Sequence, residues 1–128
     1  MKRSIAYKVR IKDLVNGEFV KDEVNYVKLF GRKVSRVNVT GMVIDKYESD
    51  NYSVITIEDE AKIRVKFFDY GGLEVNQGDL VKVIGKIRET EGERFILGEA
   101  VKKITEEQKK VHDLECLKSE VEDLGSVE

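Results

Sequence analysis

Five β-type segments set the strongest constraint on how this chain can fold. They cover residues 33–46, 52–59, 62–68, 80–88 and 94–104. Each segment is rich in Val and Ile, and polar or glycine-containing turns separate them, which is typical of short antiparallel strands. A stretch with helical spacing of apolar residues follows at 105–124. The pattern therefore predicts an all-β domain that ends in one helix.

Five strands in this order predict a Greek-key barrel of the oligonucleotide-binding (OB) type. The first strand of such a barrel must bend sharply to pair with two neighbours, and a glycine inside a strand is typical of such a bend. Gly41 lies among Val37, Val39 and Val43 in the first predicted strand, and Gly85 lies inside the fourth. We expect both glycines to mark bends of the barrel.

Alternation of apolar and polar residues assigns two faces to the third and fourth strands. Apolar residues of both parities occur in the fifth strand, so the pattern leaves its inner face unassigned. Inward we expect Ile63, Val65 and Phe67 in the third strand and Val81, Val83 and Ile87 in the fourth. Outward we expect Arg64, Lys66 and Phe68 in the third strand and Lys82 and Lys86 in the fourth.

The chain has 128 residues, which suits one domain with a real core. We predict an N-terminal strap and basic arm in residues 1–32, the barrel in 33–104 and an assembly helix with its tail in 105–128. In the strap, Asp13 is expected to cap a short helix that Gly17 ends. The loop at 69–79 has room for only one helical turn, and Gly71 and Gly72 are expected to form a flexible turn there.

Composition excludes several classes of protein. No run approaches the roughly 20 apolar residues of a membrane span, and no signal segment is evident, so we expect a soluble protein of the cytoplasm and nucleoid, or of the nucleus in a eukaryote. One cysteine and one histidine predict neither a disulfide nor a metal site, and we expect no cofactor. No constellation of nucleophile, base and stabiliser is evident, so an enzyme is not predicted.

Charge is distributed unevenly along the chain. Residues 1–46 carry a formal charge of +6, residues 47–104 carry −3 and residues 105–128 carry −5. A positive arm beside a barrel suits a phosphate backbone, whereas an acidic helix suits a protein surface. The alternative is that these charges only solvate a Lys- and Glu-rich protein, a composition common in hyperthermophiles.

The terminal helix has an apolar seam. Thr105 and Gln108 have the spacing of a capping box, and Gly125 is expected to end the helix. Because a short amphipathic helix needs another surface, the seam predicts protein partners; the alternative is that the helix packs on its own barrel. His112 is expected to be solvated, and Cys116 to lie near the seam as a small apolar residue. The seam consists of Leu114, Leu117, Val121 and Leu124, flanked by Val111.

Aromatic and cationic residues in the third strand indicate single-stranded DNA as a ligand, because bases stack on rings while cations follow the phosphates. We expect Phe68 to be the stacking platform and Arg64, Lys66 and Lys62 to contact phosphates. The alternative is that one of Phe67 and Phe68 is core and the other is covered. Three glutamates at 89–93 would repel phosphate and predict weak binding with a shallow salt dependence. Further candidates are Tyr47, Tyr52 and Tyr70 for stacking and Arg32, Lys33 and Arg94 for phosphates.

Four segments together give the chain a family resemblance. They are GRKVSRV (31–37), ITIED (55–59), VKFF (65–68) and GDLVKVIGK (78–86), with KDLVNGE (12–18) before them and a helix behind. The chain resembles the smaller subunits of archaeal and eukaryotic replication protein A. The resemblance implies that Phe68 stacks a base, that Thr90 replaces a second stacking aromatic residue, and that the last helix joins helices of two other subunits in a heterotrimer. The middle subunit usually continues into a winged-helix domain, so the resemblance fits either its barrel alone or the smallest subunit.

Three functions are compatible with these features. The first is a non-catalytic subunit of a single-stranded DNA-binding complex in DNA replication, repair and recombination. The second is an OB-fold protein-interaction module, like those of telomere-capping complexes, with little DNA affinity of its own. The third is an RNA-binding barrel attached to a translation enzyme, which leaves the terminal helix without a task.

Overall fold

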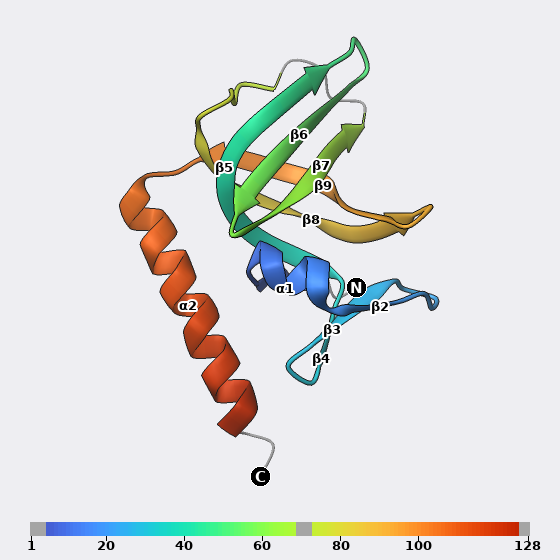
Figure 1. The fold of residues 1–128 in the computed structure, drawn as a ribbon, viewed down its shortest axis with the longest axis vertical. Coiled ribbons are helices and arrows are strands. Elements are labelled where there is room, and N and C mark those ends of the chain that lie inside the picture. Colours follow the sequence, from blue (N-terminus) through green and yellow to red (C-terminus); the bar gives the residue numbers. More distant parts are fainter. Residues whose placement is uncertain (1–4, 69–72, 126–128) are drawn as a thin grey trace.

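The computed structural model describes residues 5–68 and 73–125, with side chains up to Lys118, and Figure 1 shows its arrangement. Five strands close a barrel in the order β5, β6, β7, β9 and β8, and β8 pairs back with β5. This confirms the five-stranded OB barrel with a C-terminal helix. The strands are β1 (Tyr7–Lys8), β2 (Glu18–Val20), β3 (Tyr26–Leu29), β4 (Arg32–Val34), β5 (Arg36–Glu48), β6 (Tyr52–Asp59), β7 (Ala61–Phe68), β8 (Leu80–Thr90) and β9 (Glu93–Lys103), and the helices are α1 (Ile11–Asn16) and α2 (Glu106–Gly125).

The first predicted strand, 33–46, is two strands in the structure. Residues up to Val34 belong to β4, which forms a separate three-stranded sheet with β2 and β3. The β3–β4 turn has Phe30 and Gly31 at φ angles of 49° and 79°, so the chain reverses tightly there. The basic segment around residues 26–33 is therefore a folded hairpin, in which Val27 and Leu29 join the core.

Helix α1 covers one end of the barrel (Figure 1). Its side chains Ile11 and Leu14 are fully buried in the core. The cap position is Arg10, which makes no side-chain capping bond, so the expectation that Asp13 caps this helix is wrong. Asp13 instead lies in the first turn, where its carboxylate faces the positive end of the helix. Gly17 ends the helix as expected, and its N–H donates to the Asp13 carbonyl at 2.9 Å.

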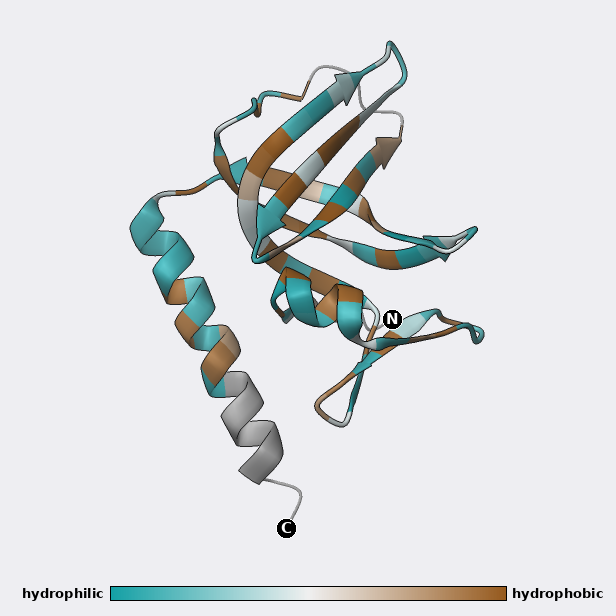
Figure 2. Cartoon of the chain, in the orientation of Figure 1, coloured by the Kyte–Doolittle hydropathy of each residue, from teal (hydrophilic) through white to brown (hydrophobic). Residues whose placement is uncertain are grey.

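The inward and outward faces of β7 and β8 are those predicted from the alternation. Figure 2 shows brown and teal residues alternating along β6 and β7. Phe67 is 3% exposed and Phe68 is 57% exposed, so the first ring packs in the core and the second faces solvent. The core is a single cluster built from the inward faces of the barrel strands and from the N-terminal segment. Burial of these Val, Ile and Phe side chains contributes about 1.5–3 kcal/mol each.

Two bulges determine which residues face inward along the longest strands. In β5, Val43 pairs with Ile57 and Asp45 pairs with Thr56, so Ile44 is an extra residue. In β9, Gly98 pairs with Gly85 and Ala100 pairs with Ile84, so Glu99 is extra. Each extra residue reverses the inward and outward parity beyond it. This explains the mixed parity of β9, where Ile96 is buried before the bulge and Val101 packs on the core after it.

Both strand glycines lie where another backbone approaches closely. A methyl group on Gly85 would overlap the carbonyl oxygen of Leu97. A Cβ atom added to Gly41 would lie 3.0 Å from the carbonyl oxygen of Glu58. The bulge of β5 is at Ile44 rather than at Gly41, so this glycine allows close packing of β6 on a strongly bent strand.

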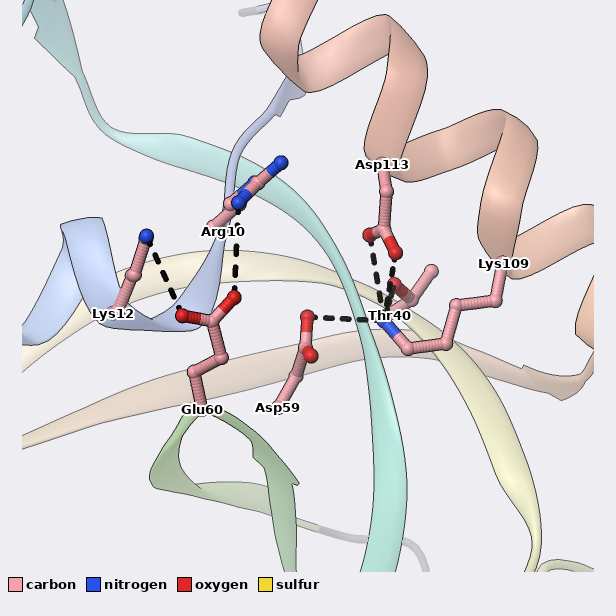
Figure 3. Close-up of polar contacts among 7 residues, drawn as sticks. All are labelled: Arg10, Lys12, Thr40, Asp59, Glu60, Lys109 and Asp113. Carbon is pink, nitrogen blue, oxygen red and sulfur yellow. Dashed lines mark hydrogen bonds and ion pairs between the residues drawn. The ribbon is translucent and has the colours of Figure 1, made fainter.

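Helix α2 begins with the predicted capping box. The Thr105 N–H donates to Gln108 Oε1 at 2.8 Å, and the Gln108 N–H donates to Thr105 Oγ1 at 3.1 Å. Lys109 Nζ then lies 2.9 Å from Asp59 Oδ2 and 3.3 Å from Thr40 Oγ1, and Figure 3 shows it joining the helix to the barrel. Lys8 and Glu115 form a further ion pair at 2.6 Å.

His112 and Cys116 form the side of α2 that faces the barrel, and each is 2% exposed. The expectation of a solvated His112 is therefore wrong, because residues four apart share one helix face and this face packs against β1 and β5. The seam points the opposite way: Val111, Leu114 and Leu117 are exposed. The helix thus packs on its own barrel with one side and presents part of its apolar seam on the other. The side chains of Val121 and Leu124 lie outside the described residues.

Burial lowers the pKa of His112 below its ordinary value of 6.5, and Lys82 and Lys109 act in the same direction, whereas the Val9 backbone and Asp113 oppose it. A histidine with a lowered folded-state pKa contributes stability above pH 6.5 that is lost as pH falls toward that pKa. We expect the free energy of unfolding to fall as the pH drops from 7.5 to 5, because the unfolded chain binds a proton at this histidine more readily than the folded chain does.

The measurement is urea unfolding at both pH values. His112→Leu should reduce the pH dependence, because the leucine cannot bind a proton. An equal pH dependence in the variant would contradict this role of His112.

Candidate nucleic-acid interface

The outer face of β5, β6 and β7 presents three cross-strand rows of side chains. Directly opposed residues of antiparallel strands lie on one face with Cβ atoms about 4.5–5.5 Å apart. The bulge at Ile44 is what turns Asp45 and Tyr47 outward, because alternation from the buried Val43 would turn them inward. The rows are Asp45 with Thr56 and Arg64, Tyr47 with Val54 and Lys66, and Tyr52 with Phe68.

These rows line a groove on the barrel surface. One hollow of about 510 Å³ contains all three rows. A second hollow of about 420 Å³ shares Asp45, Thr56 and Arg64 with the first and adds Lys62 and Glu93. The two hollows therefore form one continuous groove, with aromatic residues at one end and charged residues at the other.

Three aromatic rings form the first end of the groove. The ring centroids of Tyr47 and Tyr52 are 5.8 Å apart, and those of Tyr52 and Phe68 are 6.5 Å apart. Hydrogen bonding with Tyr47 raises the pKa of Tyr52 above its ordinary value of 10.0, so the Tyr52 ring is uncharged at neutral pH. Neutral exposed rings are suitable platforms for stacking planar bases.

A carboxylate already occupies the cationic end of the groove. Glu93 Oε2 accepts a hydrogen bond from Arg64 Nη1 at 2.9 Å, and Glu93 Oε1 lies 3.3 Å from Lys66 Nζ. The Lys66 ammonium also lies 4.2 Å from the ring centroid of Phe95. Glu93 follows the tight β8–β9 turn, in which Glu91 and Gly92 have φ angles of 53° and 79°. An incoming phosphate must therefore compete with Glu93 for both cations.

The structure brings seven of the nine predicted contact residues to this groove: Phe68, Arg64, Lys66, Lys62, Tyr52, Tyr47 and Arg94. Tyr70, a further stacking candidate, lies outside the described residues. Sequence reasoning missed Asp45 and Thr56. Asp45 faces the groove only because of the bulge at Ile44, and Thr56 is its partner on β6. The sequence contains no pattern that predicts this bulge.

Arg94 borders the second hollow, but its guanidinium holds the N-terminal segment. Arg94 Nη1 donates to the carbonyl oxygens of Leu14 and Gly17 at 2.5 and 2.7 Å, and the guanidinium lies 5.4 Å from the ring centroid of Phe19. These bonds leave Arg94 poorly placed for phosphates.

Arg32 and Lys33 lie on β4 in the second sheet. There the Arg32 guanidinium is 5.2 Å from the Tyr7 ring centroid, and Lys33 Nζ is 5.2 Å from that of Tyr26. Neither residue lines the groove. The predicted contacts therefore divide between the groove and a separate basic hairpin.

The described part of the chain contains neither a cluster of metal ligands nor a helix that could span a membrane. Among residues 5–68 and 73–125, no three His, Cys, Asp or Glu side chains gather as metal ligands would. Neither described helix combines the length and the apolar character of a membrane span.

Solved structures share this barrel and helix. The chain superposes with a TM-score of 0.83 and 16% identity on a chain of a replication protein A heterotrimer bound to ssDNA, covering 94% of this chain and 98% of that one. The fold is that of a replication protein A subunit. A chain of the S. pombe Stn1–Ten1 complex has a TM-score of 0.79 and 13% identity, with 93% of each chain covered. Yeast replication protein A bound to ssDNA has a TM-score of 0.69 and 21% identity, with 91% and 92% covered.

A curated relative exists in an archaeon. The uncharacterised protein MJ1654 of Methanocaldococcus jannaschii is 33% identical over 117 residues, which cover 91% of this chain and 49% of that protein. The chain thus spans about half the length of this relative. No protein-family model matches the chain. The replication protein A-like fold therefore rests on the structural comparison.

Proposed function

We propose that this chain is a non-catalytic subunit of a replication protein A-like complex that binds single-stranded DNA. The observation that carries the proposal is the groove in which Tyr47, Tyr52 and Phe68 adjoin Arg64 and Lys66. Neighbouring exposed rings beside cations suit a single strand without fixed sequence. The complex would act in DNA replication, repair and recombination.

The chain would bind DNA weakly by itself. Glu93 neutralises part of the charge of Arg64 and Lys66, so fewer phosphates can be neutralised and fewer counterions released. Thr90 supplies no ring on the β8–β9 hairpin. High affinity would then come from several such barrels that act together in one complex, because linked sites raise the effective concentration.

Helix α2 would join the chain to other replication protein A-like subunits, most simply in a heterotrimer. The exposed side chains of Val111, Leu114 and Leu117 support this assignment, because they form an apolar strip on the side away from the barrel. Figure 2 shows brown, apolar positions on an otherwise hydrophilic helix α2. Burying such a strip between helices would release water from all partners.

A second candidate is an interaction module with little DNA affinity. The similarity to a chain of the Stn1–Ten1 complex and the position of Glu93 favour it. It predicts the same use of α2 but no binding in the groove, so a DNA-binding measurement separates the two candidates.

The test is fluorescence anisotropy of the full chain with labelled single strands of about 15 nucleotides, at low and moderate salt. Our proposal expects saturable binding at low salt that weakens with salt and is much tighter than binding to the matching duplex. The complete absence of binding to single strands at low salt would favour the interaction module.

Glu93→Gln should raise the affinity for single strands, because Arg64 and Lys66 would no longer be neutralised by a neighbouring carboxylate. We expect the affinity to rise about tenfold. The slope of log affinity against log salt concentration should steepen by the contribution of about one neutralised phosphate. Glu91→Gln is the matched control: it makes the same charge change in the adjacent turn but does not line the groove. Equal gains in the two variants would show that only net charge matters.

A further inference from the structure

Asp45 lies at the centre of the groove. Asp45 lines both hollows, the one with the three rings and the one with Lys62 and Glu93. In the cross-strand row it is directly opposite Thr56, which is in turn opposite Arg64. The row therefore offers, side by side, an acceptor, a hydroxyl that can donate or accept, and a cationic donor.

The carboxylate of Asp45 has acceptor capacity left for a ligand. Its Oδ1 accepts the N–H of Lys46 at 2.9 Å. Within the described residues, Asp45 takes part in no ion pair, unlike Glu93 a short distance along the groove. An unpaired carboxylate repels phosphates, so its presence among stacking rings is unfavourable unless the ligand donates a hydrogen bond to it.

The four bases differ in what they can donate. Cytosine and adenine each present an amino group, and guanine presents a ring N–H beside an amino group, which matches both oxygens of a carboxylate. Thymine presents one ring N–H between two carbonyl oxygens, and each carbonyl would face the Asp45 carboxylate. Thr56 and Arg64 can meanwhile donate to ring nitrogens or carbonyl oxygens of an amino-bearing base.

We propose that Asp45 makes the groove select bases with an exocyclic amino group and disfavour thymine. This inference rests on the proposed function of the groove and adds the class of base that it prefers. It assigns Asp45 as the residue that determines specificity, while the rings and cations supply affinity that does not depend on sequence.

The test compares oligo(dC) with oligo(dT) of equal length by anisotropy with the full chain at pH 7.5 and one salt concentration. The two pyrimidines stack similarly, so the ratio of their affinities reports on the base edge. We expect oligo(dC) to bind about five- to tenfold more tightly. In Asp45→Asn the ratio should fall to about one, because an amide can both donate to and accept from thymine.

Asp22→Asn is the matched control. Asp22 is exposed, loses the same charge, and likewise accepts the N–H of the next residue at 2.9 Å, but it lies outside the groove. The ratio of the oligo(dC) and oligo(dT) affinities in this variant should equal that of the unchanged chain. Binding of oligo(dC) and oligo(dT) with equal affinity, or an unchanged ratio in Asp45→Asn, would overturn the inference and leave the proposed function intact. Failure of the unchanged chain to bind any single strand would overturn both.

Discussion

Phe68→Ala is expected to weaken the binding of single-stranded DNA by about 10- to 100-fold. Stacking of one base on a ring is worth about 1–3 kcal/mol, and a tenfold change in affinity corresponds to about 1.4 kcal/mol. Phe68 is an exposed ring at the end of β7 and adjoins Tyr52 in the groove. Because the side chain is largely exposed, its loss should leave the free energy of unfolding nearly unchanged. Anisotropy titrations at one salt concentration measure the effect.

Phe30→Ala is the control for this prediction. Phe30 is also a partly exposed phenylalanine, but it lies in the β3–β4 turn of the second sheet, outside the groove. Its loss should change the affinity by less than about twofold. Equal effects of the two substitutions would remove the groove from the binding surface and would favour the basic hairpin instead.

Leu114→Asp combined with Leu117→Asp is expected to abolish assembly with partner subunits. The two side chains are 65% and 48% exposed, so the chain alone should fold normally. In a helical interface, however, two buried unpaired carboxylates would weaken association by more than about 100-fold. Size-exclusion chromatography with light scattering, on the chain co-expressed with replication protein A-like subunits of its own host, measures this loss.

The matched variant for assembly is Ile5→Asp combined with Val24→Asp. It also places two carboxylates at exposed apolar positions, 70% and 61% exposed, but away from α2. It should assemble normally, and DNA binding by the isolated chain should survive in both double variants. Assembly of the Leu114 and Leu117 variant at wild-type strength would show that α2 is only a part of its own barrel domain.

Local patterns in the sequence determined the elements and several faces of this protein. The alternation that buries Phe67 and exposes Phe68 follows from the two-residue period of a strand. The capping box of Thr105 and Gln108 and the spacing of Leu114 and Leu117 are likewise properties of neighbouring residues. Such features depend on a few residues of one segment, so they can be predicted before the fold is known.

The tertiary structure alone decided what depends on pairing between distant segments. The bulges at Ile44 and Glu99 arise where strands must bend to close the barrel, and the first of them turns Asp45 and Tyr47 into the groove. Closure also brings Glu93 to Arg64 and packs His112 against the barrel. These contacts join residues far apart along the chain, and their geometry follows from strand register and curvature, which a local pattern does not specify.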